Sequence, residues 1–345
     1  MIFVNPILFL VLEFEMKRIL LTLMKMGIVT AILYYLIQSG RLNFERLLLL
    51  MDSPGILMMM YLILILAVVP MATLRWWLLL RAIGLKVEPK RTFLLTWIGN
   101  FFNTTLPGAI TGDVVKGYYV IRSEREEGRT RAFMTLLIDR FVGLFGLVVM
   151  AFIALIFNLD LIWKQSSLHP LAWSITGLFG ATLIFYIIAL YPFAEGRDPF
   201  IRLFNRLPGK TFLIKVYLAF KSYQHRKPTL LFTLLLSISI HMLVGLIFFE
   251  VSKLMGIRDM GLATQFFLMP IGLITVAIPV APGGIGIGHA AFESLYLLAG
   301  HSGGADIFNV FVVVQLSVFL LGGIPYFLYS GSYKVPEEET LVNGN

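Results

Sequence analysis

The chain has 345 residues, of which 58% are hydrophobic and only 14% are charged, and its formal net charge is +8. Soluble domains carry about 25% charged residues, so this composition indicates an integral membrane protein and gives no reason to expect nucleic acid as a partner. The absence of cysteine excludes disulfides and cysteine-ligated metals. The Gly-x-Ser-x-Gly, His-Glu-x-x-His and complete Gly-x-x-x-x-Gly-Lys-Ser/Thr signatures are absent as well. We therefore expect no enzyme, cofactor or metal centre.

Apolar runs define the predicted spans. A transmembrane helix needs about 20 mostly apolar residues. No basic segment followed by a small-residue cleavage site opens the chain, so we expect the first span to act as its own insertion signal. The sequence predicts an all-α polytopic membrane protein that forms a single integral domain over residues 1–345. The six predicted spans are residues 19–38, 55–80, 133–157, 171–192, 229–250 and 306–329.

Two further apolar stretches, at about 92–122 and 262–300, are interrupted by glycine and proline. Each contains an Ile-Gly pair, a Pro-Gly and then further glycine before polar or charged residues. Non-helical backbone at membrane depth must be buried in protein or must line a wet cavity. Interruptions at corresponding places in two halves are typical of the binding site of a transporter. We therefore predict two re-entrant or broken helical segments.

The distribution of Lys and Arg predicts the orientation. Residues 81–131 hold nine Lys/Arg against five Asp/Glu, and residues 195–227 hold eight against two. Residues 39–53 and 158–170 have no such excess. Because basic loops stay in the cytoplasm, the first two stretches and the N-terminus are predicted to be cytoplasmic.

The order span, span, broken segment, span occurs twice, in residues 18–157 and again in residues 171–330. Three crossings per half place the second half upside down relative to the first, so we predict an inverted 3+3 repeat. An alternative stays open, because residues 262–281 are long enough to cross the membrane completely. In that case the C-terminus lies outside.

Residues 195–227 alternate basic and apolar side chains. This pattern predicts basic amphipathic helices on the cytoplasmic leaflet, attracted to anionic lipid by about 1 kcal/mol per basic residue. An ordinary positively charged loop explains the same pattern.

The first broken segment offers an anion site. We expect Pro107 and Gly108 to turn the chain and a helix to start near Gly112, with Asp113 capping its first turn. Free amides at a helix N-terminus attract phosphate, and Lys116 lies one turn further on the same face. A plain interfacial turn with a snorkelling lysine is the alternative. The candidate substrate-binding residues here are Asn103, Pro107, Gly108, Gly112, Asp113 and Lys116.

Asp139 and Arg140 lie early in the third predicted span, residues 133–157. Neighbours on a helix point about 100° apart, so we expect different partners for them, with Arg140 as a buried cation near a lipid phosphate. Both could instead anchor the span at the interface. Arg75 is expected to snorkel, Trp76 to join an aromatic belt, and His241 to be a neutral, hydrogen-bonded histidine rather than a proton relay.

The second broken segment ends in His289 and Glu293, which share one helix face. A proton-coupled or phosphate-facing pair and a hydrogen-bonded packing pair are both open interpretations. Two ligands alone indicate a metal only weakly. The candidate substrate-binding residues here are Pro282, Gly283, Gly284, Gly286, His289 and Glu293.

These stretches resemble the flippase-like family defined by the transmembrane domain of lysylphosphatidylglycerol synthases. The resemblance covers nearly the whole chain and rests on Asn103 to Lys116, Asp139 to Leu144 and Pro282 to Gly286. It implies a multi-pass protein of a bacterial or archaeal cytoplasmic membrane that moves lipids or lipid-linked head groups between leaflets. One departure is that the family often has Glu shortly after Pro-Gly-Gly, where this chain has His289, with Glu293 one turn later.

The functional hypothesis is a translocase for an anionic phospholipid or a polyprenyl-phosphate-linked substrate. Amides from Gly108 to Asp113 and from Gly283 to Gly286 would hold the head group, and Lys116 and Arg140 would supply positive charge. The expected partners are membrane lipids, mainly anionic ones, and a homo-oligomer is one option. Two alternatives are an intramembrane enzyme acting on a lipid phosphate, with His289 or Asp113 as acid or base, and a small-solute transporter.

Overall fold

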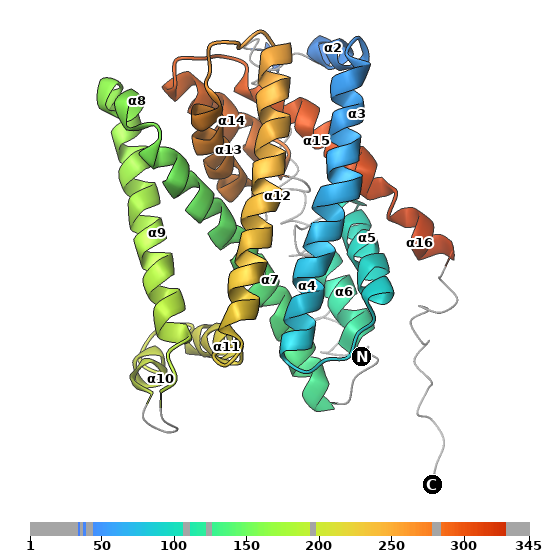
Figure 1. Ribbon diagram of the computed structural model, residues 1–345, viewed down its shortest axis with the longest axis vertical. Helices are drawn as coiled ribbons and strands as arrows, with labels where there is room; N and C mark the ends of the chain where they lie inside the picture. Colours follow the sequence, from blue (N-terminus) through green and yellow to red (C-terminus); the bar gives the residue numbers. More distant parts are fainter. Residues whose placement is uncertain are drawn as a thin grey trace, which may run out of the picture.

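The computed structural model describes residues 34, 37–38, 44–105, 111–121, 126–193, 198–277 and 284–328. Every regular element in these ranges is helical, which confirms the predicted all-α membrane fold (Figure 1). In chain order the elements are η1 (Phe44–Leu47), α2 (Leu48–Met51), α3 (Pro54–Leu62), η2 (Ile63–Val68), α4 (Val69–Ala82), α5 (Pro89–Thr105), α6 (Thr111–Ile121), α7 (Glu126–Ile156), α8 (Leu159–Lys164), η3 (Ser166–Leu168), α9 (His169–Ala189), α10 (Pro199–Phe204), α11 (Lys210–Lys221), α12 (Lys227–Leu254), α13 (Leu262–Val276), α14 (Ile287–Leu298), α15 (Gly304–Leu320) and α16 (Gly323–Leu328).

Within the described residues, five helices are long and apolar enough to cross a membrane. They confirm the last five of the six predicted spans, while most of the predicted span 19–38 lies outside the described residues. The first of the five runs without a break through α3, η2 and α4, although Pro70 removes a backbone donor. The π-helical turn η2 directly precedes it, and a wider turn accommodates the missing hydrogen bond and the proline ring. The five helices are Pro54–Ala82, Arg131–Ile156, Ser166–Ala189, Lys227–Leu254 and Gly304–Leu328.

The predicted broken segments are two pairs of short helices. We call α5 and α6 the first hairpin and α13 and α14 the second hairpin, because the two helices of each pair pack against each other. Helix α13 has 15 residues, which is about 22 Å at 1.5 Å per residue. The hydrocarbon core is about 30 Å thick, so α13 is too short to cross it alone. The connections 106–110 and 278–283 lie outside the described residues.

Close backbone contacts hold both hairpins in place. A Cβ atom on Gly112 would lie 1.8 Å from the carbonyl oxygen of Gly99, where α6 crosses α5. A Cβ atom on Gly304 would lie 2.2 Å from the carbonyl oxygen of Phe292, where α15 crosses α14. Neither distance leaves room for a side chain, so both crossings require glycine.

Helix α7 is the centre of the packing. It crosses diagonally behind α12 and packs against α4, α6, α9, α11, α12 and α13 (Figure 1). Each hairpin packs against the final spans of both halves, its second helix against its own half (α6 with α7, α14 with α15) and its first helix against the other half. The second hairpin packs against α7 through α13, and the first packs against α15 through α5.

The segment 195–227 contains the predicted amphipathic helices α10 and α11, but the apolar face of α11 does not lie on lipid. Tyr217 and Phe220 are fully buried in a cluster with Val142 of α7 and Ala189 of α9. The prediction of a leaflet-bound apolar face is therefore wrong for α11. Its aromatic side chains fill a space between two spans, which a sequence pattern cannot distinguish from lipid contact.

Asp198, which precedes α10, connects α10 to α11 within this segment. Its carboxylate accepts hydrogen bonds from the Phe200 amide at 3.0 Å and from the Tyr217 hydroxyl at 2.8 Å, and it forms an ion pair with Lys221. Burial raises the pKa of the Asp198 carboxyl, but its three partners outweigh this effect, so the pKa lies below its ordinary value.

Candidate functional site: a charge cluster inside the membrane domain

The first ion-pair group connects the first hairpin to α7. Helix α6 begins at Thr111, close to the predicted start, and places Asp113 in its first turn. Asp113 Oδ1 lies 2.7 Å from the Lys116 ammonium, and Asp113 Oδ2 accepts a hydrogen bond from Arg140 Nε of α7. Lys116 is buried, so the alternative of a snorkelling lysine is wrong.

The second ion-pair group joins three spans. Arg75 of α4 binds Asp139 of α7 through two parallel hydrogen bonds, Nε to Oδ1 at 2.7 Å and Nη2 to Oδ2 at 3.1 Å. Its remaining nitrogen, Nη1, donates to Ser237 Oγ of α12 at 2.9 Å. The expectation that Arg75 snorkels to water is therefore wrong. The prediction that Asp139 and Arg140 have different partners is confirmed.

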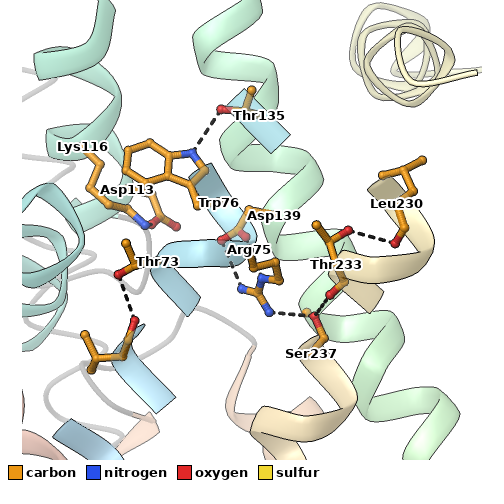
Figure 2. A network of polar contacts seen from close by, with 12 residues as sticks. Thr73, Arg75, Trp76, Asp113, Lys116, Thr135, Asp139, Leu230, Thr233 and Ser237 are labelled. Carbon is orange, nitrogen blue, oxygen red and sulfur yellow. Dashed lines mark hydrogen bonds and ion pairs between the residues drawn. The ribbon is translucent and has the colours of Figure 1, made fainter. Parts of the chain in front are cut away.

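Trp76 brings the two groups together. Its ring lies 4.9 Å from the Lys116 ammonium, and its Nε1 donates to Thr135 Oγ1 at 3.2 Å. Figure 2 shows the ring beside the Lys116–Asp113 pair, and Arg75 precedes Trp76 directly on the same helix. Trp76 is almost completely buried, so it does not belong to an interfacial belt as predicted. An ammonium over a tryptophan face is stabilised by the ring quadrupole.

We call Arg75, Asp113, Lys116, Asp139 and Arg140 the charge cluster. Its three cations and two carboxylates leave one positive charge in excess among these five side chains. Arg140 is the most accessible of the three cations, with 33% of its side chain exposed against 8% for Lys116. Charges in membrane spans are costly and pair with one another or mark a substrate path. Three cations gathered in this way suit an anionic ligand.

The predicted amide cradle is wrong for the two candidate amides that have described partners. In the first hairpin, the Gly112 N–H donates to Asn103 Oδ1 at 2.8 Å. In the second, the Gly286 N–H donates to His289 Nδ1 at 3.2 Å. Asn103, rather than Asp113, therefore caps the start of α6. The candidates Pro107, Gly108, Pro282 and Gly283 lie outside the described residues.

The end of the second connection depends on glycine. Gly284 and Gly286 have φ angles of +69° and +84°, a backbone region that side-chain-bearing residues rarely adopt. This turn aims the chain into α14 and puts the Gly286 amide within reach of the His289 ring. We therefore assign both glycines a structural role.

His289 and Glu293 are brought near α15 but bind different groups there. His289 Nε2 lies 3.2 Å from Asn309 Oδ1, and Glu293 Oε2 accepts a hydrogen bond from the Ala305 amide at 3.1 Å. Because His289 Nδ1 accepts from the Gly286 amide, its Nε2 carries the proton and donates to Asn309. Both residues tie α14 to α15, as the packing interpretation expects. The described residues contain no group of three His, Asp or Glu side chains that could hold a metal.

His241 is the hydrogen-bonded histidine that we expected. Its Nε2 lies 3.0 Å from the carbonyl oxygen of Gly143 and donates to it, which connects α12 to α7. Gly143 also leaves room for Arg75, whose Nη1 lies 3.3 Å from the position of a Cβ atom there. The histidine thus supports the helix contact that holds the second ion-pair group.

Sequence reasoning missed three members of this site, namely Arg75, Trp76 and Ser237. A usable signal existed for Arg75, because a second charge in a span calls for an opposite charge in another span, and Asp139 supplies it. No such signal marks Ser237, which is one of many serines in apolar helices. Its role follows only from the packing of α12 beside α4.

A comparison with curated proteins gives no match. A family model described as the lysylphosphatidylglycerol synthase TM region matches residues 22–325. The match includes both hairpins, α7 and the whole charge cluster, and it connects the chain with membrane lipids. The chain belongs to this family of multi-pass membrane proteins.

Proposed function

We propose that the protein is a translocase that moves an anionic lipid or a lipid-linked head group between leaflets. The observation that carries the proposal is the charge cluster, which lies among α4, α6, α7 and α12 within an apolar membrane domain. A phosphodiester is an anion of the kind that Arg and Lys side chains bind. Membership in a family named for a lipid synthase supports a lipid rather than a small solute.

Asp113 holds two of the cations that a phosphate would bind. Its carboxylate forms ion pairs with Lys116 and Arg140 at the same time. An incoming phosphate therefore exchanges with a carboxylate instead of meeting bare cations. Arginine binds phosphate through paired hydrogen bonds, so Arg140, the most accessible of the three cations, makes the first contact.

The arrangement of helices supports an inverted repeat as part of this proposal. Each half contains a span, a hairpin of two short helices and a final span. Each hairpin packs against the final span of the other half. A twofold axis in the membrane plane would relate the contact of α13 with α7 to the contact of α5 with α15. Transporters place their substrate sites at repeat interfaces of this kind. We further propose a bacterial or archaeal cytoplasmic membrane, with α10, α11 and the N-terminus in the cytoplasm.

Reconstitution tests the translocase directly. Liposomes with the purified protein and fluorescent phosphatidylglycerol are treated with dithionite, which bleaches the outer leaflet only. We expect faster loss of the protected fluorescence than in empty liposomes. Arg140→Gln should slow the exchange by about tenfold or more, because one charge-assisted contact contributes about 1.5–3 kcal/mol. Lys253→Gln is the matched control, since Lys253 forms a separate ion pair with Glu250 on α12.

Two results would count against the proposal. One is exchange no faster than in empty liposomes across phosphatidylglycerol and polyprenyl-phosphate sugars. The other is formation of a new lipid product in detergent, where no leaflets exist, because a translocase makes no bond and an intramembrane enzyme does.

A further inference from the structure

Helix α9 stands apart from the rest of the domain. Only 6% of its most apolar stretch is buried, compared with 56% for α7, and it packs mainly against α7 and α11. Figure 1 shows α9 at the edge of the bundle, with α10 and α11 at its lower end. Of the cavities that border this helix, two are lined by Tyr186 near its C-terminal end, and neither of these contains a member of the charge cluster.

The larger cavity, of about 490 Å³, lies between α7 and α9. Its lining is almost entirely apolar. It reaches from Val216 of α11 to Ile274 of α13, close to the C-terminal end of that helix. On α7 it is lined by Phe141 and Phe145, on the opposite face from Asp139. The cavity therefore runs from the α11 end of α9 to the tip of the second hairpin.

The smaller cavity, of about 430 Å³, lies between the end of α9 and the start of α12. Leu231 and Leu234 supply its apolar wall, and the exposed Lys227 stands at its rim. Both volumes fall within the range of about 300–1,000 Å³ that small-molecule sites occupy. Each space suits an apolar chain, and only the second has a cation beside it.

Tyr186 lies between the two cavities and lines both. Its ring stacks on Phe145 with centroids 4.5 Å apart. Its hydroxyl is buried and has no hydrogen-bond partner among the residues that the structure describes. A buried hydroxyl without a partner is costly, so an acceptor from a ligand would stabilise it. Tyr186 is three residues from the end of α9, about 4.5 Å along its axis.

We propose that these features form a binding site for one anionic phospholipid with two acyl chains. One chain fills the cavity between α7 and α9, and the other fills the cavity between α9 and α12. The ester oxygens accept the Tyr186 hydroxyl proton in a hydrogen bond, and the phosphate lies near Lys227. The binding site stands by itself, whereas its role as the entry point for the translocated lipid rests on the proposed function.

Photolabelling tests the site. The full chain is placed in phosphatidylcholine nanodiscs with a trace of phosphatidylglycerol that carries a diazirine in one acyl chain, and labelled peptides are mapped by mass spectrometry. We expect labels on the cavity faces of α7 and α9 that excess unlabelled phosphatidylglycerol removes.

Ala181→Phe puts a ring into the larger cavity, which leaves less room for an acyl chain. It should reduce the labelling of α7 by about tenfold. Gly180→Phe is the matched control, because it adds the same ring about 100° away around α9, at a position where nothing lies within 4 Å of an added Cβ atom.

The head-group contact has its own test. Lys227→Gln should lower the preference for phosphatidylglycerol over a phosphatidylcholine probe by about fivefold. Lys215→Gln removes an equal charge from α11 and should leave that preference unchanged. If Ala181→Phe does not fold, this comparison decides alone.

Equal labelling in wild type and Ala181→Phe, or labelling that ignores the head group, would overturn the site and leave only general bilayer contact. Leaflet exchange measured on the same preparations separates the two proposals. Site-specific labelling without exchange overturns the translocase and keeps the site, while exchange without site-specific labelling does the reverse.

Discussion

The two hairpins share one design but differ in the chemistry that they contain. In each, a side chain of the hairpin binds an amide at the start of the second helix, Asn103 in the first and His289 in the second. A glycine lets two backbones touch within the first hairpin, at Gly112, and where α15 meets the second hairpin, at Gly304. The first hairpin then adds Asp113 and Lys116 to the charge cluster, whereas the second contributes hydrogen bonds from His289 and Glu293 to α15.

Aromatic packing completes the second hairpin. Phe292 stacks on Phe308 of α15, with centroids 5.0 Å apart, and on Phe248 of α12, with centroids 4.9 Å apart. All three rings are fully buried. The difference teaches that one copy of the design holds charge while the other fixes the position of the neighbouring helices.

The largest effect should come from the backbone crossings that both hairpins need. Gly112→Ala and Gly304→Ala each place a methyl group against a carbonyl oxygen, and each should lower the free energy of unfolding by about 3 kcal/mol or more. Thermal denaturation followed by size-exclusion fluorescence measures both. Gly180→Ala, with open space around it, should be neutral or slightly stabilising. A tolerated Gly112→Ala would refute the close crossing.

Removing a carboxylate should have different effects on stability in the two hairpins. Asp113→Asn takes the carboxylate away from the buried Lys116 and the partly exposed Arg140, and it should destabilise the protein by about 3 kcal/mol. Glu293→Gln keeps an acceptor for the Ala305 amide and should cost about 1 kcal/mol. Anionic lipid should restore more thermal stability to Asp113→Asn than to Glu293→Gln. Equal losses in both variants would contradict the division of roles.

The two amide-binding side chains should have similar importance. Asn103→Ala and His289→Ala each leave a backbone N–H without its acceptor, so each should lower stability by about 2 kcal/mol. His289→Gln should recover part of the loss, since its amide oxygen can accept. A variant of His289 that folds normally but abolishes leaflet exchange would instead assign this residue a transport role.

The smallest effect concerns Asp198, outside both hairpins. Its lowered pKa means that its ionised form stabilises the fold above the unfolded pKa of about 3.9, and that this stabilisation is lost as the pH falls through the folded pKa. Asp198→Asn should therefore lower the melting temperature at pH 7, by the equivalent of about 1 kcal/mol. The difference from wild type should begin to shrink as the pH falls below about 4 and should vanish only below the folded pKa. A difference that persists there would point to a cause other than charge.

Much of the fold could be predicted from the sequence because the bilayer restricts the options. Apolar runs of about 20 residues must be helices that satisfy their own backbone. The five described spans and both hairpins therefore follow from apolar runs and their glycine and proline interruptions. The angle between Asp139 and Arg140 also follows from local geometry, which is why their separate partners were predictable.

The partners themselves could not be predicted, because they depend on how helices far apart in sequence meet. Arg75 pairs with Asp139 across 64 positions, and Ser237 joins them from a third helix. The burial of Tyr217 on α11 depends in the same way on the position of α9. An amphipathic pattern shows that a face is apolar but not whether lipid or protein covers it.

The crossing of Gly99 and Gly112 has a mechanical consequence. Two helices whose backbones touch cannot slide or pivot against each other without a clash, so α5 and α6 move as one rigid body. Lys116 and Asp113 travel with that body, while Arg75 and Arg140 belong to the spans beside it. Any rocking of the first hairpin against α7 would therefore have to stretch or break the ion pair between Asp113 and Arg140.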